Sequence, residues 1–214
     1  MLCLFDLDGT LIDSELGVTA CIRHALGKLD IPTPIDLREW IGPPLRQSFA
    51  PLMDHDAERV EAAVRYYHER FAELGWREYA IYPGIETMIA GLQAAGHQLA
   101  IVTSKPHRHA QPIIDALPFG AYFERLYGPH PSSPHSEKAT MIAAALADFG
   151  ASPKKTVMIG DRRYDIEGAV ANDVAGIGVL WGFGSREELE AAGAHAVIDH
   201  PDRLAALVDS TCIC

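Results

Sequence analysis

Helix and strand patterns alternate from residue 82 to the end of the chain, and no other feature of the sequence constrains the fold as strongly. Strands are predicted over 98–102, 156–159, 174–179 and 196–198, with a strand or loop over 123–127. Helices are predicted over 85–95, 107–117, 137–149, 164–171, 185–192 and 201–208. This alternation indicates a parallel sheet with helices wound on both faces. Ligands of such sheets bind at the carboxyl ends of the strands.

The first strand of this sheet is predicted at the start of the chain, in the short apolar run from Leu2 to Asp6. Continuous apolar runs are typical of parallel strands that are buried on both faces. This run ends at Asp6, and a second acid, Asp8, follows before Gly9 and Thr10. An unpaired buried carboxylate is costly. A bound cation would offset that cost, so the pair predicts a cation site at the end of the strand.

The segment between the first strand and residue 82 is helical in character. From Glu15 to about Tyr79 no segment alternates apolar and polar residues as a strand does. Pro and Gly residues break the segment into helices near 15–29, 36–41, 45–53 and 57–76. We therefore predict an α/β protein with a doubly wound, Rossmann-like parallel sheet. Its core would comprise residues 1–14 and 82–214, with an all-helical cap inserted over residues 15–81.

Polar residues follow the other predicted strands at the points where those strands end. Thr103 and Ser104 follow the strand at 98–102, and Asp161 and Asp165 follow the strand at 156–159. Lys138 lies at the start of a helix between them. Several oxygen ligands suit Mg²⁺, and a hydroxyl with a lysine suits a phosphate group. Each residue alone has an ordinary explanation, such as a strand end, a helix cap or a solvated lysine, so the prediction depends on their common location.

Four groups of residues together resemble the signature motifs of the haloacid dehalogenase-like (HAD) hydrolase superfamily, in the same order. They are Asp6-Leu7-Asp8-Gly9-Thr10, Thr103, Lys138 and Gly160-Asp161-x-x-x-Asp165. The resemblance covers nearly the whole chain, including a helical cap between the first and second motifs. It is strongest to the phosphoglycolate phosphatase-like group. Two further strings, Gly160-Asp161-Arg162-x-x-Asp165 and Val179-Leu-Trp-Gly-Phe-Gly184 followed by Glu187-Glu188-Leu189, are similar to members described as 5′-nucleotidase-like.

The resemblance implies a role for each matching residue. Asp6 would be the nucleophile that forms an aspartyl-phosphate, and Asp8 would be the general acid and base. Asp6, Asp161 and Asp165 would bind Mg²⁺ by their side chains, Asp165 directly or through water, and Asp8 by its backbone carbonyl. Thr103 and Lys138 would clamp the phosphate. Further phosphate contacts are expected from Gly9, Thr10 and Ser104.

The predicted cap would choose the substrate, because a helical lid admits small molecules and excludes a folded protein. Within it, Arg46 follows the rigid turn at Gly42-Pro43-Pro44. We predict that Arg46 contacts a second anionic group of the substrate; the alternative is a solvent-exposed arginine at a helix start. His107 and His109 are assigned to an ordinary helix start, and His130 and His135 to a surface loop.

Composition excludes several classes of function. The net charge of −11 disfavours nucleic acid as a partner. The sequence has no apolar run long enough to span a bilayer and no secretory leader, which predicts a cytoplasmic protein with no membrane partner. The four cysteines, Cys3, Cys21, Cys212 and Cys214, form no pattern typical of a disulfide framework or a zinc site. We expect a monomer or a homodimer.

These features predict a Mg²⁺-dependent phosphomonoester hydrolase that acts on a small phosphorylated metabolite. Dehalogenases of the superfamily dispense with the second acid, which this chain keeps as Asp8. A sugar-phosphate mutase also keeps that acid and stays an alternative, as does a catalytically silent binding or regulatory protein. The sequence does not choose among phosphoglycolate, nucleoside monophosphates and sugar phosphates as substrates.

Overall fold

A computed structural model describes residues 1–129 and 137–211 of the chain. Its centre is a six-stranded sheet in the order β5-β4-β1-β6-β7-β8, and every neighbouring pair is parallel. The strands are β1 (Leu2–Phe5), β4 (Gln98–Val102), β5 (Phe123–Tyr127), β6 (Thr156–Gly160), β7 (Ala175–Val179) and β8 (Ala196–Ile198). The segment at 123–127, predicted as a strand or a loop, is therefore a strand at the edge of the sheet.

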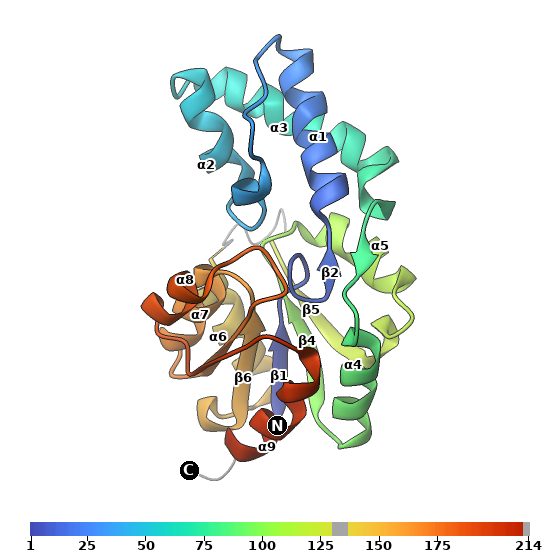
Figure 1. The fold of residues 1–214 in the computed structure, drawn as a ribbon, viewed down its shortest axis with the longest axis vertical. Coiled ribbons are helices and arrows are strands. Elements are labelled where there is room, and N and C mark those ends of the chain that lie inside the picture. The colour runs from blue at the N-terminus through green and yellow to red at the C-terminus, as the bar shows by residue number, and fades with distance from the viewer. Residues whose placement is uncertain (130–136, 212–214) are drawn as a thin grey trace. The chain divides into compact units, whose positions relative to one another are not determined.

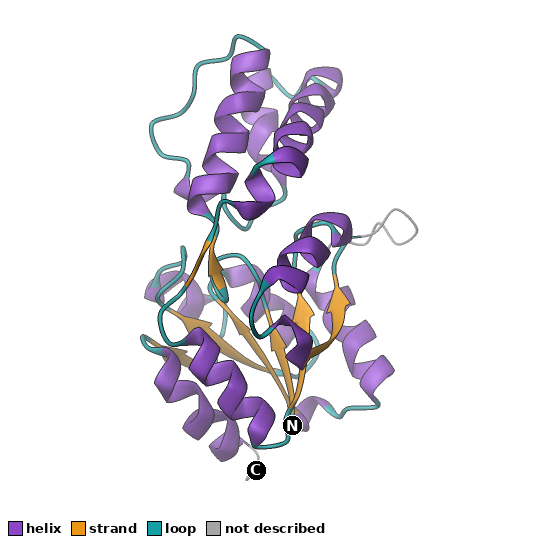
Figure 2. Cartoon of the chain, turned by 90° about the vertical axis from the view of Figure 1, so that its right-hand side faces the viewer, coloured by secondary structure: helices purple, strands orange, loops and turns teal. Residues whose placement is uncertain are grey.

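Helices cover both faces of this sheet (Figures 1 and 2). They are α4 (Ile85–Ala94), α5 (His107–Ala116), α6 (Lys138–Phe149), α7 (Arg163–Val170), α8 (Arg186–Ala191) and α9 (Leu204–Thr211). The three helices α6, α7 and α8 pack in sequence against one another, and α4 packs against α9. Short 3₁₀ turns lie at Gly120–Tyr122, Pro153–Lys155 and Pro201–Arg203. The predicted α/β fold class is confirmed.

Strand β1 lies at the point where the order of the strands reverses. It pairs with β4 on one side, where Leu2 faces Gln98, and with β6 on the other, where Leu2 faces Thr156. All four of its side chains are buried, and Leu2 and Leu4 belong to a core cluster that includes apolar residues of α6 and α7. In an open parallel sheet, the carboxyl ends of the strands beside such a switch point form the usual ligand site. The end of β1 is therefore the expected position of a ligand site.

The chain divides into two compact units, one comprising residues 1–12 and 81–214 and the other residues 13–80. A two-stranded sheet of β2 (Ile12–Asp13) and β3 (Ala80–Ile81) lies where the chain passes between them. These two strands were not predicted from the sequence. A two-residue strand is too short to show an alternating pattern, so only the pairing itself reveals it.

The unit of residues 13–80 contains α1 (Glu15–Lys28), α2 (Leu45–Phe49) and α3 (Ala57–Glu73). Its 3₁₀ turns are at Arg38–Trp40, Ala50–Met53 and Gly75–Arg77. The buried faces of α1 and α3 pack against each other. The helices predicted over 45–53 and 57–76 each end in a 3₁₀ turn. Among the residues that the structure describes, no helix is both long enough and apolar enough to cross a membrane.

Candidate active site

Three strands deliver polar residues to one edge of the sheet. Asp6 directly follows β1, and its backbone N–H donates to the Ile159 carbonyl oxygen at 2.9 Å, which extends the β1–β6 pairing by one residue. Asp161 directly follows β6, and Thr103 directly follows β4. Because β4 and β6 are the parallel neighbours of β1, Thr103 and Asp161 emerge at the same edge of the sheet as Asp6, although they lie 97 and 155 positions from it in the chain.

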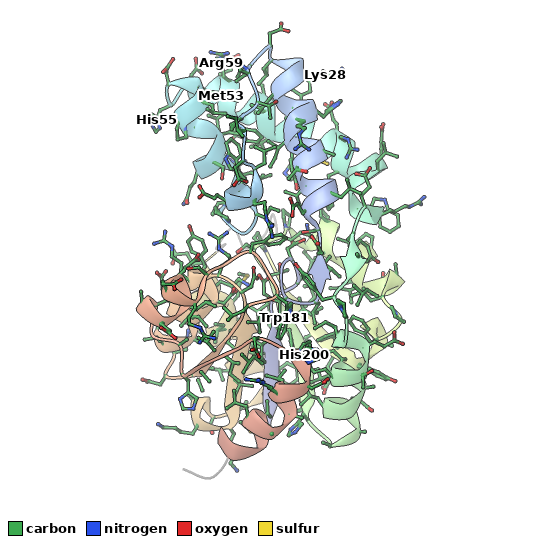
Figure 3. All side chains as sticks on the ribbon, viewed as in Figure 1. Lys28, Met53, His55, Arg59, Trp181 and His200 are labelled. Carbon is green, nitrogen blue, oxygen red and sulfur yellow. The ribbon has the colours of Figure 1, made fainter. Side chains whose placement is uncertain are left out.

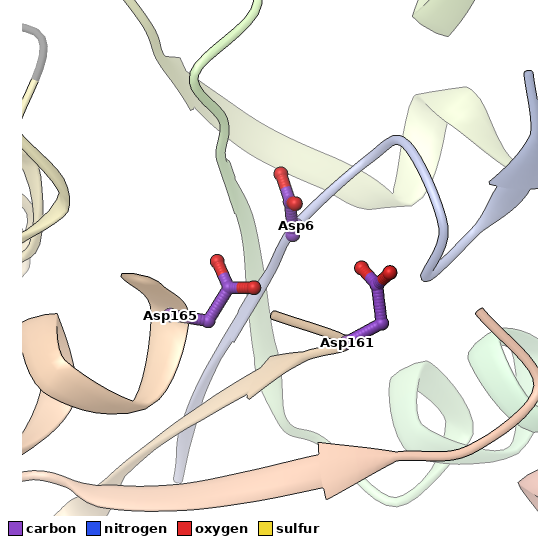
Figure 4. A group of neighbouring side chains, drawn as sticks. All are labelled: Asp6, Asp161 and Asp165. Carbon is purple, nitrogen blue, oxygen red and sulfur yellow. The ribbon is translucent and has the colours of Figure 1, made fainter. Parts of the chain in front are cut away.

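The carboxylates of Asp6, Asp161 and Asp165 form a compact acidic cluster (Figure 4). One oxygen of each lies within 4.8 Å of the others. Asp6 is 6% exposed, and Asp161 and Asp165 are fully buried. Three buried acids so close together repel one another, so the cluster requires positive charge to be stable.

Lys138, the first residue of α6, supplies part of that positive charge. Its Nζ atom lies 2.9 Å from Asp6 Oδ1 and 2.6 Å from Asp165 Oδ1, and it donates to the Val102 carbonyl oxygen at 2.7 Å. The side chain is almost completely buried. The ammonium group thus makes two ion pairs and one hydrogen bond. Lys138 therefore connects the ends of β1, β4 and α7 rather than extending into solvent.

Burial and mutual repulsion raise the pKa values of the acids in this cluster. Burial, helped by Asp165 and opposed by Lys138, raises the pKa of Asp6 from 3.8 to about 6. Burial and the charges of Asp165 and Asp6 raise the pKa of Asp161 well above its ordinary value. Burial by itself lowers the pKa of Lys138, but the two neighbouring acids outweigh burial, and the net direction is upward.

The cluster fits a divalent cation. With all three carboxylates ionised, one ammonium leaves two negative charges without a counter-charge, and their sum equals in magnitude the charge of one Mg²⁺. The available ligand atoms are carboxylate oxygens from three different segments, the donor type that Mg²⁺ prefers. The residues that would hold the ion through their side chains are Asp6, Asp161 and Asp165.

Backbone groups and a hydroxyl hold the two acids of the last motif in place. Asp161 Oδ1 accepts from the Thr10 hydroxyl at 3.2 Å, and its Oδ2 accepts from the Phe183 N–H at 2.9 Å. Asp165 Oδ2 accepts from the Arg162 N–H at 3.1 Å, which caps α7. Gly9 has a φ of +83°, and a side chain there would collide with the Asp161 carboxylate. The Gly9 position therefore requires glycine on two counts, conformation and space.

Asp8 is not part of the acidic cluster, and its carboxylate forms an ion pair with a different lysine. Its Oδ2 lies 3.0 Å from Lys105 Nζ, and both side chains are largely buried. The backbone N–H of Lys105 donates to Thr103 Oγ1 at 3.2 Å. Lys105 was not among the predicted site residues, since a lysine three residues beyond a strand end is ordinarily a surface residue. The strand-end string Thr103-Ser104-Lys105 was the one available signal.

Comparisons with known proteins identify the family. A family described as haloacid dehalogenase-like hydrolase matches residues 3–179, which is most of the chain. The chain belongs to this family. The match spans every segment that contributes to the site just described except the turn after β7, which contains Phe183.

Individual HAD-like relatives cover the chain almost completely. A 5′-nucleotidase of Pseudomonas aeruginosa is 40% identical over 190 residues, which cover 88% of this chain and 86% of that protein. The tyrosine-protein kinase PtkA of Mycobacterium tuberculosis is 33% identical, with 92% of this chain and 67% of that protein covered. A predicted phosphatase from Clostridium acetobutylicum has a solved structure with a TM-score of 0.91, 36% identity and 98% of both chains covered.

The remaining predicted residues of this HAD-like hydrolase lie outside the acidic cluster. Ser104 is half-buried in the turn after β4. Arg46 lies on α2 in the unit of residues 13–80, where its Nη2 donates to Glu61 Oε2 of α3 at 2.9 Å. His107 and His109 are in the first turn of α5, as predicted. His130, His135, Cys212 and Cys214 lie outside the described residues.

Proposed function

We propose that the protein is a Mg²⁺-dependent phosphomonoester hydrolase that acts through an aspartyl-phosphate on Asp6. The observation that carries the proposal is the acidic cluster at the carboxyl end of β1, with Lys138 ion-paired to Asp6 and Asp165. A phosphate ester brings negative charge to a site that already has an excess of it. The proposal therefore includes the cation, which would neutralise the excess and polarise the phosphoryl group.

Asp6 is the proposed nucleophile because it is the acid at the end of the central strand. A carboxylate oxygen of Asp6 forms a bond to phosphorus while the bond from phosphorus to the ester oxygen breaks. Lys138 holds the other side of the Asp6 carboxylate through Oδ1. Thr103 and Ser104, in the turn after β4, are the proposed contacts for the phosphoryl oxygens, together with the Gly9-Thr10 backbone.

Asp8 is the proposed proton donor and acceptor. It gives its proton to the alkoxide that leaves phosphorus, and then takes a proton from the water that hydrolyses the aspartyl-phosphate. Lys105 holds the Asp8 carboxylate at 3.0 Å, in a largely buried position. Hydrolysis returns Asp6 to its carboxylate form and releases inorganic phosphate, so atoms and charges balance over the two steps.

The proposed substrate is a small phosphorylated metabolite, and the 40% identity to a 5′-nucleotidase favours a nucleoside monophosphate over phosphoglycolate. We assign residues 15–81 as the cap that selects it, with Arg46 as a contact for a second anionic group. Membership of the family is also compatible with a sugar-phosphate mutase, and the similarity to PtkA adds transfer of phosphate to tyrosine as a further alternative.

A substrate panel tests the proposal. The purified protein is incubated with Mg²⁺ and a series of nucleoside monophosphates, phosphoglycolate, sugar phosphates and p-nitrophenyl phosphate, and free phosphate is measured. We expect phosphate release that falls by at least about 10³-fold in D6N, since loss of a covalent nucleophile removes the main reaction path. D115N, a change on the exposed side of α5, is the matched control and should keep wild-type activity.

Each alternative predicts a different result in the same panel. Isomerised sugar phosphate without phosphate release would indicate a mutase. Transfer of labelled phosphate from ATP to a tyrosine peptide, without hydrolysis of the esters, would indicate a kinase. No reaction with any substrate of the panel, with ligand binding intact, would favour a binding protein and reject the proposal.

A further inference from the structure

The turn that leaves β7 runs beside the end of β6, because β6 and β7 are parallel neighbours. The β7 turn comprises Trp181-Gly182-Phe183-Gly184. The backbone N–H of Leu180, just before it, donates to the Ile198 carbonyl oxygen of β8 at 2.9 Å. The start of the β7 turn is therefore anchored in the sheet rather than loose at its edge.

The β7 turn bonds directly to Asp161. The Phe183 N–H donates to Asp161 Oδ2 at 2.9 Å. Because the donor is a backbone group, its direction is set by the path of the turn and not by the phenylalanine ring. An Asp carboxylate that accepts on both oxygens cannot rotate freely about its Cβ–Cγ bond.

The second bond to Asp161 is also held by the β7 turn, through an intermediate residue. The Trp181 indole N–H donates to the Thr10 carbonyl oxygen at 2.9 Å, and the Thr10 hydroxyl donates to Asp161 Oδ1 at 3.2 Å. Trp181 is labelled in Figure 3, at the end of the sheet where β1 and β6 terminate. The β7 turn thus supplies the donor to one oxygen of the Asp161 carboxylate and holds the residue that donates to the other.

Two glycines allow the β7 turn to come this close. A side-chain carbon on Gly182 would lie within 3.0 Å of the Gly9 carbonyl oxygen and of the Asp161 side chain. A side-chain carbon on Gly184 would collide with the Asp161 carbonyl oxygen. The backbone of the turn therefore packs on the backbone of the two motifs that carry Asp6 and Asp161, with no space for a methyl group.

We propose that the β7 turn is a positioning element for Asp161, which holds both carboxylate oxygens in the orientation that divalent cation binding requires. The inference rests on the proposed function, in which Asp161 is a ligand of Mg²⁺. Groups that orient metal ligands through hydrogen bonds change metal affinity by about 10- to 100-fold when removed. Neither Trp181 nor Gly182 is proposed to touch the substrate or the cation.

The test measures cation binding directly and without substrate. Mn²⁺ is titrated into the protein at neutral pH, the free ion is followed by its electron paramagnetic resonance signal, and Mg²⁺ is then added as a competitor. W181F removes the indole N–H and keeps an aromatic ring, and we expect its Kd for Mn²⁺ to rise about 10-fold. G182A displaces the turn and should raise Kd further. Gly91, on α4 with open space around it, provides the control G91A, which should bind as the wild type does.

Kinetics separate positioning from general loss of structure. In W181F the Mg²⁺ concentration for half-maximal rate should rise with Kd, and saturating Mg²⁺ should restore most of the wild-type kcat. A merely structural role would lower the fraction of folded protein, seen by thermal unfolding in EDTA, and leave the Kd of the folded molecules unchanged. That result would overturn the inference. Should G182A not fold, W181F decides alone.

The variant D161N distinguishes the two levels of the proposal. If D161N loses Mn²⁺ binding while W181F and folded G182A bind as the wild type does, the role of the β7 turn is rejected and the metal site stands. If D161N binds Mn²⁺ as tightly as the wild type, Asp161 is not a ligand, and the metal assignment in the proposed function fails together with the role of the turn.

Discussion

Asp6 is the residue whose environment changes its chemistry most clearly. Burial raises its pKa from 3.8 to about 6, so between these two pH values, and without a divalent cation, the folded protein keeps a proton on Asp6 that the unfolded chain has already released. The stabilisation of the folded state that follows from this raised pKa is fully present below pH 3.8. That stabilisation is lost as the pH rises to about 6.

A stability measurement on D6N tests this shift, because its amide does not titrate. In EDTA, the free energy of unfolding of the wild type should fall relative to that of D6N as the pH rises from about 4 to 6, and the difference should level off above that range. The expected change is on the order of 3 kcal/mol, since tenfold in proton affinity corresponds to about 1.4 kcal/mol. Denaturant titrations at several pH values give the result, and a constant difference would contradict the shift.

Mg²⁺ should offset the loss of stability that ionisation of the acidic cluster causes. A cation beside Asp6, Asp161 and Asp165 favours their charged forms, so Mg²⁺ should raise the unfolding midpoint more at pH 7 than at pH 5. D161N is the comparison, because it lacks one of the three acids. A stabilisation by Mg²⁺ that is equal at both pH values, or equal in D161N, would speak against a cation in this cluster.

At the level of whole elements, the position of Lys138 depends on how closely α6 and α7 pack. Gly168 of α7 lies against the start of α6, and a side-chain carbon there would lie 2.7 Å from Lys138 Cβ. The same crossing places Asp165 of α7 at 2.6 Å from Lys138 Nζ. A small residue at 168 therefore serves both the helix packing and the ion pair.

We expect G168A to destabilise the protein by about 1–3 kcal/mol, because overpacking forces two helices apart. The matched change G91A, in α4, meets nothing within 4 Å and should be neutral or stabilising by up to about 1 kcal/mol. Urea denaturation of the two variants checks both values. Equal effects of the two substitutions would show that helix propensity, and not the close crossing, decides the outcome at 168.

At the scale of the whole molecule, the proposed function requires the unit of residues 13–80 to supply substrate contacts. Arg46 is the proposed contact, and in the structure it is paired with Glu61, with both side chains substantially exposed. Exposed ion pairs contribute at most about 1 kcal/mol. Removing Arg46 should therefore leave stability almost unchanged and make its effect on substrates easy to interpret.

R46A should raise KM for a substrate with a second anionic group by about 10-fold, with little change for p-nitrophenyl phosphate, because only the former loses a charge-assisted contact. E61Q is the control: it keeps Arg46 and removes the charge of its partner, so KM should not rise. Steady-state kinetics on both substrates measure these effects. An equal change in KM for the two substrates would argue against a role for Arg46 in recognition.

Much of the fold could be predicted from local patterns. The strands at 98–102 and 196–198 have the predicted bounds, and most other elements of the sheet differ from prediction by one or two residues at an end. These elements are long or strongly apolar, so their periodicity is clear. The strands β2 and β3 were not predicted because two residues are too few to show an alternating pattern of apolar and polar residues. The two 3₁₀ turns that end predicted helices in the unit of residues 13–80 were not predicted because a 3₁₀ turn and an α-helix have similar sequence patterns.

The sequence by itself determined the alternation of strand and helix, and with it the edge of the sheet where Asp6, Thr103 and Asp161 must emerge. These are consequences of local periodicity and of the parallel sheet that it implies. Only the tertiary structure decided which side chains meet at that edge. Lys105 faces Asp8, Lys138 joins Asp6 to Asp165, and Trp181 holds Thr10. Those contacts connect residues up to 171 positions apart, and their geometry is set by the order of the strands and the packing of helices, which no local pattern encodes.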